Sequence, residues 1–273
     1  MSDNNSCCNE EQTAFGVLYL IYYAIILVTW DSIIVKPMRL MATFVHEMSH
    51  AMMCWITGGN VEQIEVYNNE GGVTRFRGGC RCLITPAGYL GEAFWGMFFT
   101  VMSGGRITSI VTAIGFVISL LLALCYSPNR TMVILNLCYA LFTTIFIVIE
   151  WFFFTPILAF VVLLLGVFLS AYALGDIYRS TIAHTIKGSD AYALHEESGK
   201  CCHPKCIGIQ WFFVALFMQL FGIWLALVLV SDDCADLNWS ECLISGEPFA
   251  FVGDLFDGDW GKNWDFDKWF DNR

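Results

Sequence analysis

Residues 151–175 read WFFFTPILAFVVLLLGVFLSAYALG and contain no Asp, Glu, Lys or Arg. About 20 apolar residues are enough for a helix to cross the hydrocarbon core of a bilayer. No water reaches that core, so a segment that spans it must satisfy its own backbone hydrogen bonds, as a helix does. This stretch therefore predicts a membrane-spanning helix and decides the class of fold.

Similar hydrophobic runs are spread along the rest of the chain. Four further runs lack charged residues, and two more are interrupted by a single acid each, Glu47 or Glu92. We therefore predict seven helices, near residues 14–34, 39–57, 86–102, 107–126, 131–149, 156–174 and 208–230.

The composition of the chain supports the same class. Of its 273 residues, 57% are hydrophobic and only 14% are charged, and the mean hydropathy is +0.60. A soluble domain has about 25% charged residues, so a water-soluble globule, a disordered chain and a coiled coil are excluded. The expected fold class is an all-α polytopic membrane protein with about six to seven transmembrane helices.

The distribution of charge divides the chain into three parts. The polar N-terminal segment, 1–13, lacks the basic start of a signal peptide, so we expect the first helix to stay as an anchor. Residues 14–230 form the transmembrane domain. Residues 231–273 form an acidic, aromatic-rich tail with eleven acids and three bases, which holds −8 of the net charge of −11. This tail is typical of a solvated segment, with partner docking or a calcium loop as alternatives.

The orientation follows from the positive-inside rule. With seven spans, the side of the N-terminus carries eight Lys and Arg residues and the opposite side carries six. We therefore expect an integral, multi-pass protein with a cytoplasmic N-terminus, in a membrane whose compartment the sequence leaves open. The glycosylation motif Asn238-Trp239-Ser240 agrees with this orientation, and the motif Asn129-Arg130-Thr131 opposes it.

The second predicted helix contains the most informative motif, His46-Glu47-Met48-Ser49-His50. Positions i and i+4 of a helix lie on one face, so His46 and His50 present two imidazoles to one ion. Glu47 lies beside them, placed to take a proton from a water on that ion. The H-E-x-x-H pattern thus supplies two neutral nitrogen ligands for zinc and a carboxylate base.

Chance does not explain this motif. With five His and twelve Glu in 273 residues, roughly 0.004 matches to H-E-x-x-H are expected. Ionisable residues in membrane helices are costly and usually serve a site, and here three of them occur within five positions. A polar cluster that only holds helices together is the weaker interpretation.

Three segments together resemble the M50 metallopeptidases of the site-2-protease class, and within them the M50B-like branch. The first is HEMSHAMMCWITGG at 46–59, a motif helix that ends on glycines. The second is VEQIEVYNNEGGVTRFRGGCRCLI followed by TPAGYLGEAFWG at 61–96, which resembles the strand-like insert and small-residue third helix of the branch. The third is LSAYALGDIYRSTI followed by KGSDAYAL at 169–194, which resembles the branch's late Asp-bearing motif and its Ser-Asp-Ala.

The resemblance implies a third zinc ligand, an Asp from a later membrane helix. Asp176 is the residue that matches, directly after the uncharged run 151–175. The chain lacks the Asn-Pro-Asp-Gly motif of classical site-2 proteases, so other donors stay open as candidates: Glu92, Glu150, Asp190 and Cys54. Asp190 could also orient a ligand or cap a helix, and we favour capping.

Two further segments carry weaker signals. Residues 60–85 alternate around Gly71-Gly72, which suits a short β-hairpin. The resemblance implies that this hairpin lies against the active site, where its edge could bind an unwound substrate; an interfacial loop without that role is the alternative. The cluster Cys201-Cys202-His203-Pro204-Lys205-Cys206 has metal donors but lacks a second C-x₂-C pair.

The resemblance implies an intramembrane zinc metalloprotease. We expect His46, His50 and Asp176 to bind one zinc per chain, with zinc-bound water as nucleophile and Glu47 as general base that passes the proton to the leaving amine. The expected partners are a membrane-anchored protein substrate and the lipid bilayer, with no nucleic acid, and the oligomeric state is open. The alternatives are a catalytically silent scaffold or chaperone and a non-proteolytic membrane zinc protein such as a transporter.

Overall fold

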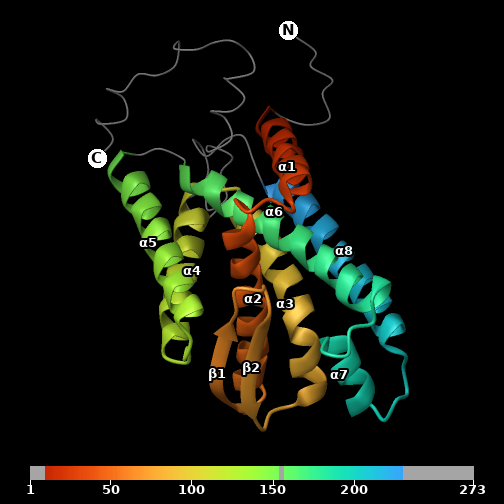
Figure 1. The fold of residues 1–273 in the computed structure, drawn as a ribbon. Coiled ribbons are helices and arrows are strands. Elements are labelled where there is room, and N and C mark those ends of the chain that lie inside the picture. Colours follow the sequence, from red (N-terminus) through yellow and green to blue (C-terminus); the bar gives the residue numbers. More distant parts are fainter. Residues whose placement is uncertain (1–9, 154–156, 230–273) are drawn as a thin grey trace.

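The structure is a computed structural model that describes residues 10–153 and 157–229 of the chain. A π-helical segment, η1 (Tyr178–Ala183), continues the sixth long helix, and a short helix, α7 (Asp190–Glu197), precedes the last one. The two strands are β1 (Asn60–Val66) and β2 (Gly72–Arg77). Figure 1 shows the long helices: α1 (Glu10–Thr29), α2 (Lys36–Ile56), α3 (Arg81–Met102), α4 (Arg106–Leu124), α5 (Arg130–Phe153), α6 (Ile157–Ile177) and α8 (Pro204–Leu229).

The described residues confirm the predicted class, an all-α polytopic membrane protein. Five helices are long and apolar enough to cross a membrane: α1, α4, α5, α6 together with η1, and α8. The other two predicted spans, α2 and α3, are also long helices, but they carry charged residues that include Glu47 and Glu92. The division into segments 1–13, 14–230 and 231–273 stays a prediction, and the acidic tail lies outside the described residues.

Two helix boundaries differ by five residues from the sequence prediction, and one short helix was not predicted. α1 ends at Thr29, before the predicted residue 34, because a turn follows and Pro37 then enters the first turn of α2, where its missing N–H is not needed. α3 begins at Arg81 instead of residue 86, so Pro86 lies inside the helix. The sequence does not predict α7, because it is only eight residues long and lies in a polar segment.

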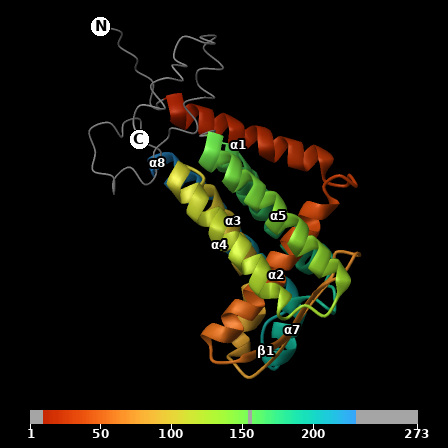
Figure 2. The same cartoon turned by 90° about the vertical axis from the view of Figure 1, so that its left-hand side faces the viewer.

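Helices α3 and α6 form the centre of the bundle. α3 packs against α2, α6 and α8, and α6 is far more enclosed by protein than the other four apolar helices. α4 and α5 form a pair on one side of this centre, as Figures 1 and 2 show, and α1 packs against α6 and α8. A helix that is apolar on all sides is suited to this enclosed position.

Two glycines let α3 and α6 approach closely. A Cβ built at Gly96 would lie 2.6 Å from the backbone nitrogen of Ser170, and one built at Gly166 would lie 2.6 Å from the backbone nitrogen of Thr100. In a membrane, helices associate through such close packing, because lipid is as apolar as the side chains it would replace. This contact fixes the position of α6 relative to α3.

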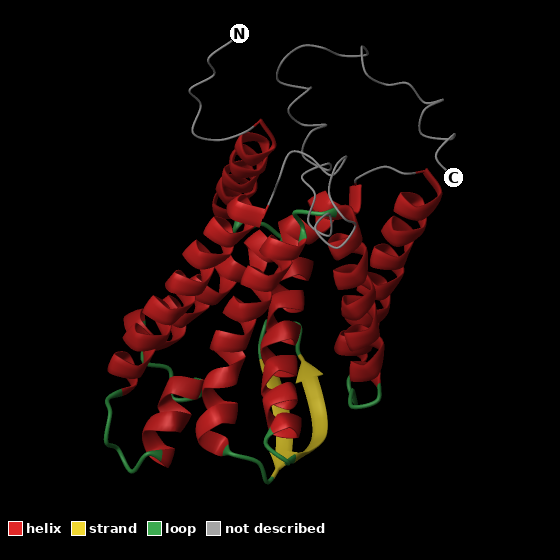
Figure 3. Ribbon diagram, turned by 180° about the vertical axis from the view of Figure 1, so that it is seen from behind, coloured by secondary structure: helices red, strands yellow, loops and turns green. Residues whose placement is uncertain are grey.

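The predicted β-hairpin is present and lies against α2 at one end of the bundle (Figure 3). β1 and β2 pair antiparallel, with Val66 opposite Gly72. An ion pair of 2.8 Å between Arg39 and Glu70 holds the turn of the hairpin to α2. In the described part of the chain, no strand pairs with the outer edge of β2.

Gly96→Ala should lower the melting temperature of the detergent-purified protein, because its methyl group would press against the backbone of Ser170. Overpacking of this kind costs about 1–3 kcal/mol. Gly115→Ala in α4 is the matched control, since a Cβ at Gly115 meets nothing within 4 Å. Equal melting temperatures for the two variants would contradict the close approach of α3 and α6.

Candidate metal centre

Helix α2 brings the two motif histidines together. His46 and His50 are four residues apart and lie on the face of α2 that packs against α3. Their Nε2 atoms are 3.2 Å apart, and their rings are nearly perpendicular, with centroids 4.9 Å apart. The spacing in the sequence therefore yields the predicted pair of nitrogen donors.

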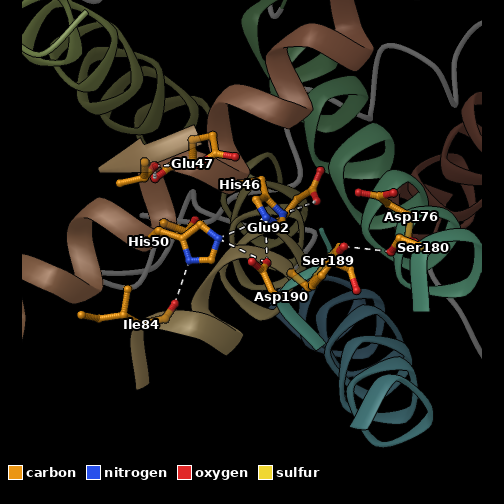
Figure 4. A network of polar contacts seen from close by, with 12 residues as sticks. His46, Glu47, His50, Ile84, Glu92, Asp176, Ser180, Ser189 and Asp190 are labelled. Carbon is orange, nitrogen blue, oxygen red and sulfur yellow. Dashed lines mark hydrogen bonds and ion pairs between the residues drawn. The ribbon is translucent and has the colours of Figure 1, made fainter. Parts of the chain in front are cut away.

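The carboxylate that meets these histidines belongs to Asp190, at the start of α7 (Figure 4). Asp190 Oδ2 lies 3.0 Å from His46 Nε2 and 3.3 Å from His50 Nε2. In the part of the chain that the structure describes, these three residues are the one group of donors that could hold a metal ion, with ligand atoms within 4.8 Å of one another.

The position of Asp190 depends on how α7 is docked. Ser189 is the N-cap of α7, and its hydroxyl accepts a hydrogen bond from the backbone N–H of Tyr192. At the other end of α7, Glu197 accepts a hydrogen bond of 3.1 Å from Thr85 of α3. The favoured interpretation of Asp190 as a helix cap is therefore wrong: Ser189 caps the helix, and the Asp190 carboxylate faces the histidines.

Two effects act on the pKa of Asp190, which lies outside the apolar helices. Burial raises the pKa of this carboxyl, but the charge of His50 and the hydrogen bonds from His46 and His50 lower it more, so that the pKa lies well below its usual range. The carboxyl is therefore an anion near neutral pH, which is the form that a metal ligand requires.

Space for an ion exists because position 88 of α3 is a glycine. A Cβ built at Gly88 would lie 2.4 Å from the Nε2 atoms of both His46 and His50. Zinc binds imidazole nitrogen at about 2.0–2.1 Å, so the volume that a methyl group would fill is the volume that the ion needs. Two imidazoles and a carboxylate are also donors that zinc prefers.

The predicted third ligand, Asp176, lies at the end of α6 on the wall of a cavity of about 230 Å³. His46, Glu47 and Asp190 line the same cavity. Asp176 is not a member of the three-donor group, and Figure 4 shows it on the far side of His46 from His50. Its role as a ligand stays a prediction that the geometry does not favour.

The other candidate donors lie elsewhere. Glu150 forms an ion pair of 3.3 Å with Arg106, at the end of α6 opposite to Asp176. Cys54 is buried beside Gly59: a Cβ built at Gly59 would lie 2.5 Å from the Sγ atom of Cys54. Among the described residues, the Cys201–Cys206 cluster does not form a three-donor group.

Glu47, the predicted base, is buried between α2 and the hairpin. Its Oε2 atom accepts a hydrogen bond of 2.7 Å from the hydroxyl of Thr74 on β2. A Cβ at Gly72 would lie 2.5 Å from Glu47 Oε1, so the hairpin backbone packs directly on this side chain. The sequence did not indicate Thr74 as a partner of Glu47, because a threonine that alternates within a strand gives no signal of its own.

The fold and the site together define a class: a helical membrane protein with an H-E-x-x-H helix and a His-His-Asp group that could hold a metal. The family model described as Peptidase M50B-like matches residues 19–222. This match covers most of the 273 residues, and the chain belongs to the M50B-like peptidase family. No curated protein and no solved structure matches the chain.

Gly88→Ala should abolish zinc binding, because its methyl group would occupy the space between His46 Nε2 and His50 Nε2. The measurement is the zinc content of the purified protein after incubation with zinc. Gly91→Ala is the control: a Cβ there crowds Ser49 of α2 at 2.5 Å but does not reach the imidazoles. If Gly88→Ala retained one zinc per chain, the ion would bind elsewhere.

Proposed function

We propose that this chain is an intramembrane zinc metalloprotease that hydrolyses peptide bonds of membrane-anchored proteins. The observation that carries the proposal is the convergence of His46, His50 and Asp190 beside Gly88, with Glu47 on the wall of the adjoining cavity. Membership of the M50B-like peptidase family supports the same reaction class.

His46, His50 and Asp190 would hold the zinc ion, one per chain. Three protein ligands are typical of catalytic zinc, since the fourth position stays open for water or substrate. Asp176, on the same cavity wall, is the alternative third ligand that the resemblance implies. The geometry favours Asp190, because its Oδ2 atom already lies within hydrogen-bonding distance of both histidines.

When bound, zinc supplies Lewis acidity, which polarises a carbonyl group and makes water acidic enough to lose a proton near neutral pH. Glu47 then acts as the general base: its carboxylate takes a proton from the attacking water and passes it to the leaving amine. The Thr74 hydroxyl occupies one oxygen of Glu47, so the other oxygen is available for the proton.

The hairpin is suited to hold the substrate. A peptide must be extended at the cleavage point, because a helix hides its carbonyl groups. The outer edge of β2 has no strand partner in the described residues, and Gly72 and Thr74 of β2 contact Glu47. A substrate strand that paired with this edge would therefore lie close to the base.

A protease needs Glu47 as its general base, whereas a silent scaffold or a transporter does not. A scaffold also does not need the metal. The substrate's membrane anchor and the surrounding bilayer are the expected partners. The cytoplasmic N-terminus stays a prediction, and the compartment stays open.

The metal content of the detergent-purified protein tests the site. We expect one zinc per chain in the wild type and in Asp176→Ala, and none in His46→Ala or Asp190→Ala, because each of these removes one of three ligands. Zinc loss in Asp176→Ala with retention in Asp190→Ala would make Asp176 the third ligand. No zinc uptake by the wild type would contradict the protease and leave the scaffold.

Glu47→Gln should retain zinc and lose hydrolysis by at least about 100-fold, the contribution typical of a general base. The assay uses proteoliposomes with a mixture of synthetic single-span peptides, in which mass spectrometry detects new N-termini. Glu62→Gln is the control. Glu62 lies on the hairpin that packs against Glu47, where it forms an exposed ion pair with Arg77. Cleavage by Glu47→Gln at the wild-type rate would contradict the role of Glu47 as general base.

A further inference from the structure

Glu92 of α3 is completely buried, and its carboxyl group makes no hydrogen bond. Its exposed fraction is 0%, and neither carboxylate oxygen has a hydrogen-bond partner. A buried carboxylate without a partner is strongly unfavourable, and in a membrane protein such a residue usually serves a site. In the described part of the chain, no Lys or Arg forms an ion pair with Glu92.

A group that could donate a hydrogen bond to Glu92 is Nδ1 of His46. This is the imidazole nitrogen on the side away from Asp190. Glu92 Oε2 lies 4.0 Å from His46 Nδ1, and Nδ1 is also buried without a hydrogen-bond partner. Figure 4 shows Glu92 beside His46, close to the centre. Two unsatisfied polar groups, one a potential donor and the other an acceptor, thus face each other across slightly more than hydrogen-bonding distance.

In both imidazoles of the centre, the Nδ1 atom faces an oxygen atom. His50 Nδ1 lies 2.7 Å from the backbone oxygen of Ile84, which can only accept a hydrogen bond. His50 Nδ1 therefore carries a proton and donates to this oxygen, so Nε2 is the nitrogen that would bind an ion. A small movement of the His46 ring would give His46 the same arrangement, with the Glu92 carboxylate as the acceptor.

We propose that Glu92 is a positioning residue: it accepts a hydrogen bond from His46 Nδ1 when His46 Nε2 binds zinc. The inference rests on the proposed zinc site. The carboxylate fixes the tautomer and the direction of the ring, and its negative charge makes the imidazole a stronger ligand. A neutral carbonyl serves His50 and a carboxylate serves His46, so His46 is the more strongly donating ligand of the two.

Glu92 is not itself a ligand of the same ion. The two nitrogens of an imidazole point away from each other, and Asp190 occupies the Nε2 side of His46 while Glu92 lies on the Nδ1 side. A purely structural role also fits poorly, because the described contacts give this carboxylate no hydrogen bond that would hold α3 in place.

Zinc affinity of the full-length protein, measured in detergent by competition with a coloured chelator, tests this role. Glu92→Leu should bind zinc about 10- to 100-fold more weakly than the wild type, the usual effect of removing such a partner. Glu92→Gln should lose less, since its amide oxygen can still accept from His46 Nδ1. The absorption spectrum of the cobalt-substituted protein should also change in Glu92→Leu, because the ring of His46 is no longer held.

Glu150→Leu is the matched control, since Glu150 is also a buried acid but belongs to the ion pair with Arg106 far from the centre. It should lower the melting temperature and leave zinc affinity unchanged. If Glu92→Leu bound zinc as tightly as the wild type while His46→Ala lost it, the role of Glu92 would be wrong and the zinc site would stand. If the wild type bound no zinc, both would fall.

Discussion

Two imidazoles and one carboxylate meet where helices α2, α3 and α7 come together, and the packing of these helices depends on this meeting. Each of these groups would be strongly unfavourable alone in such surroundings, and together they satisfy one another. The meeting requires α3 to lie close against α2 with no side chain at Gly88, and it requires α7 to dock on α3 so that Asp190 points inward. The contact between α3 and α6 at Gly96 and Gly166 then holds the centre of the bundle rigid behind the site.

The sequence predicts the features that depend on neighbours along the chain. Five charge-free runs, and two runs with a single acid each, locate the seven long helices, since the bilayer imposes a length and a polarity on such segments. The i, i+4 spacing predicts the His46–His50 pair, because both side chains belong to one helix. The alternation of residues 60–85 predicts the hairpin. The approach of Asp190 to the histidines could not be predicted in this way, because it depends on the docking of α7, which is short, polar and without a hydrophobic pattern. The resemblance pointed to Asp176, whereas the carboxylate that meets the histidines is the other Asp of the same segment, Asp190.

Glu47 and Glu92 have different surroundings, which match the different roles that we propose for them. Glu47 borders the cavity, and Thr74 of the hairpin holds it by a hydrogen bond. Glu92 has no access to solvent, and its Oε2 atom lies 4.0 Å from Nδ1 of His46. The first can exchange protons with water and the second cannot, so the two acids are suited to catalysis and to positioning respectively. Neither distinction is visible in the sequence, where both acids interrupt otherwise apolar runs.

The three candidate ligands of the centre lie far apart in the order of synthesis. His46 and His50 belong to the second helix, whereas Asp190 follows about 140 residues later, just before α8. At about 5–20 residues per second, a ribosome needs on the order of ten seconds to make the chain between them. During this time the motif helix is already made while its carboxylate partner does not yet exist. The three donors can therefore meet only after Asp190 has been made, so the candidate centre cannot form while the helices before α7 are still being inserted.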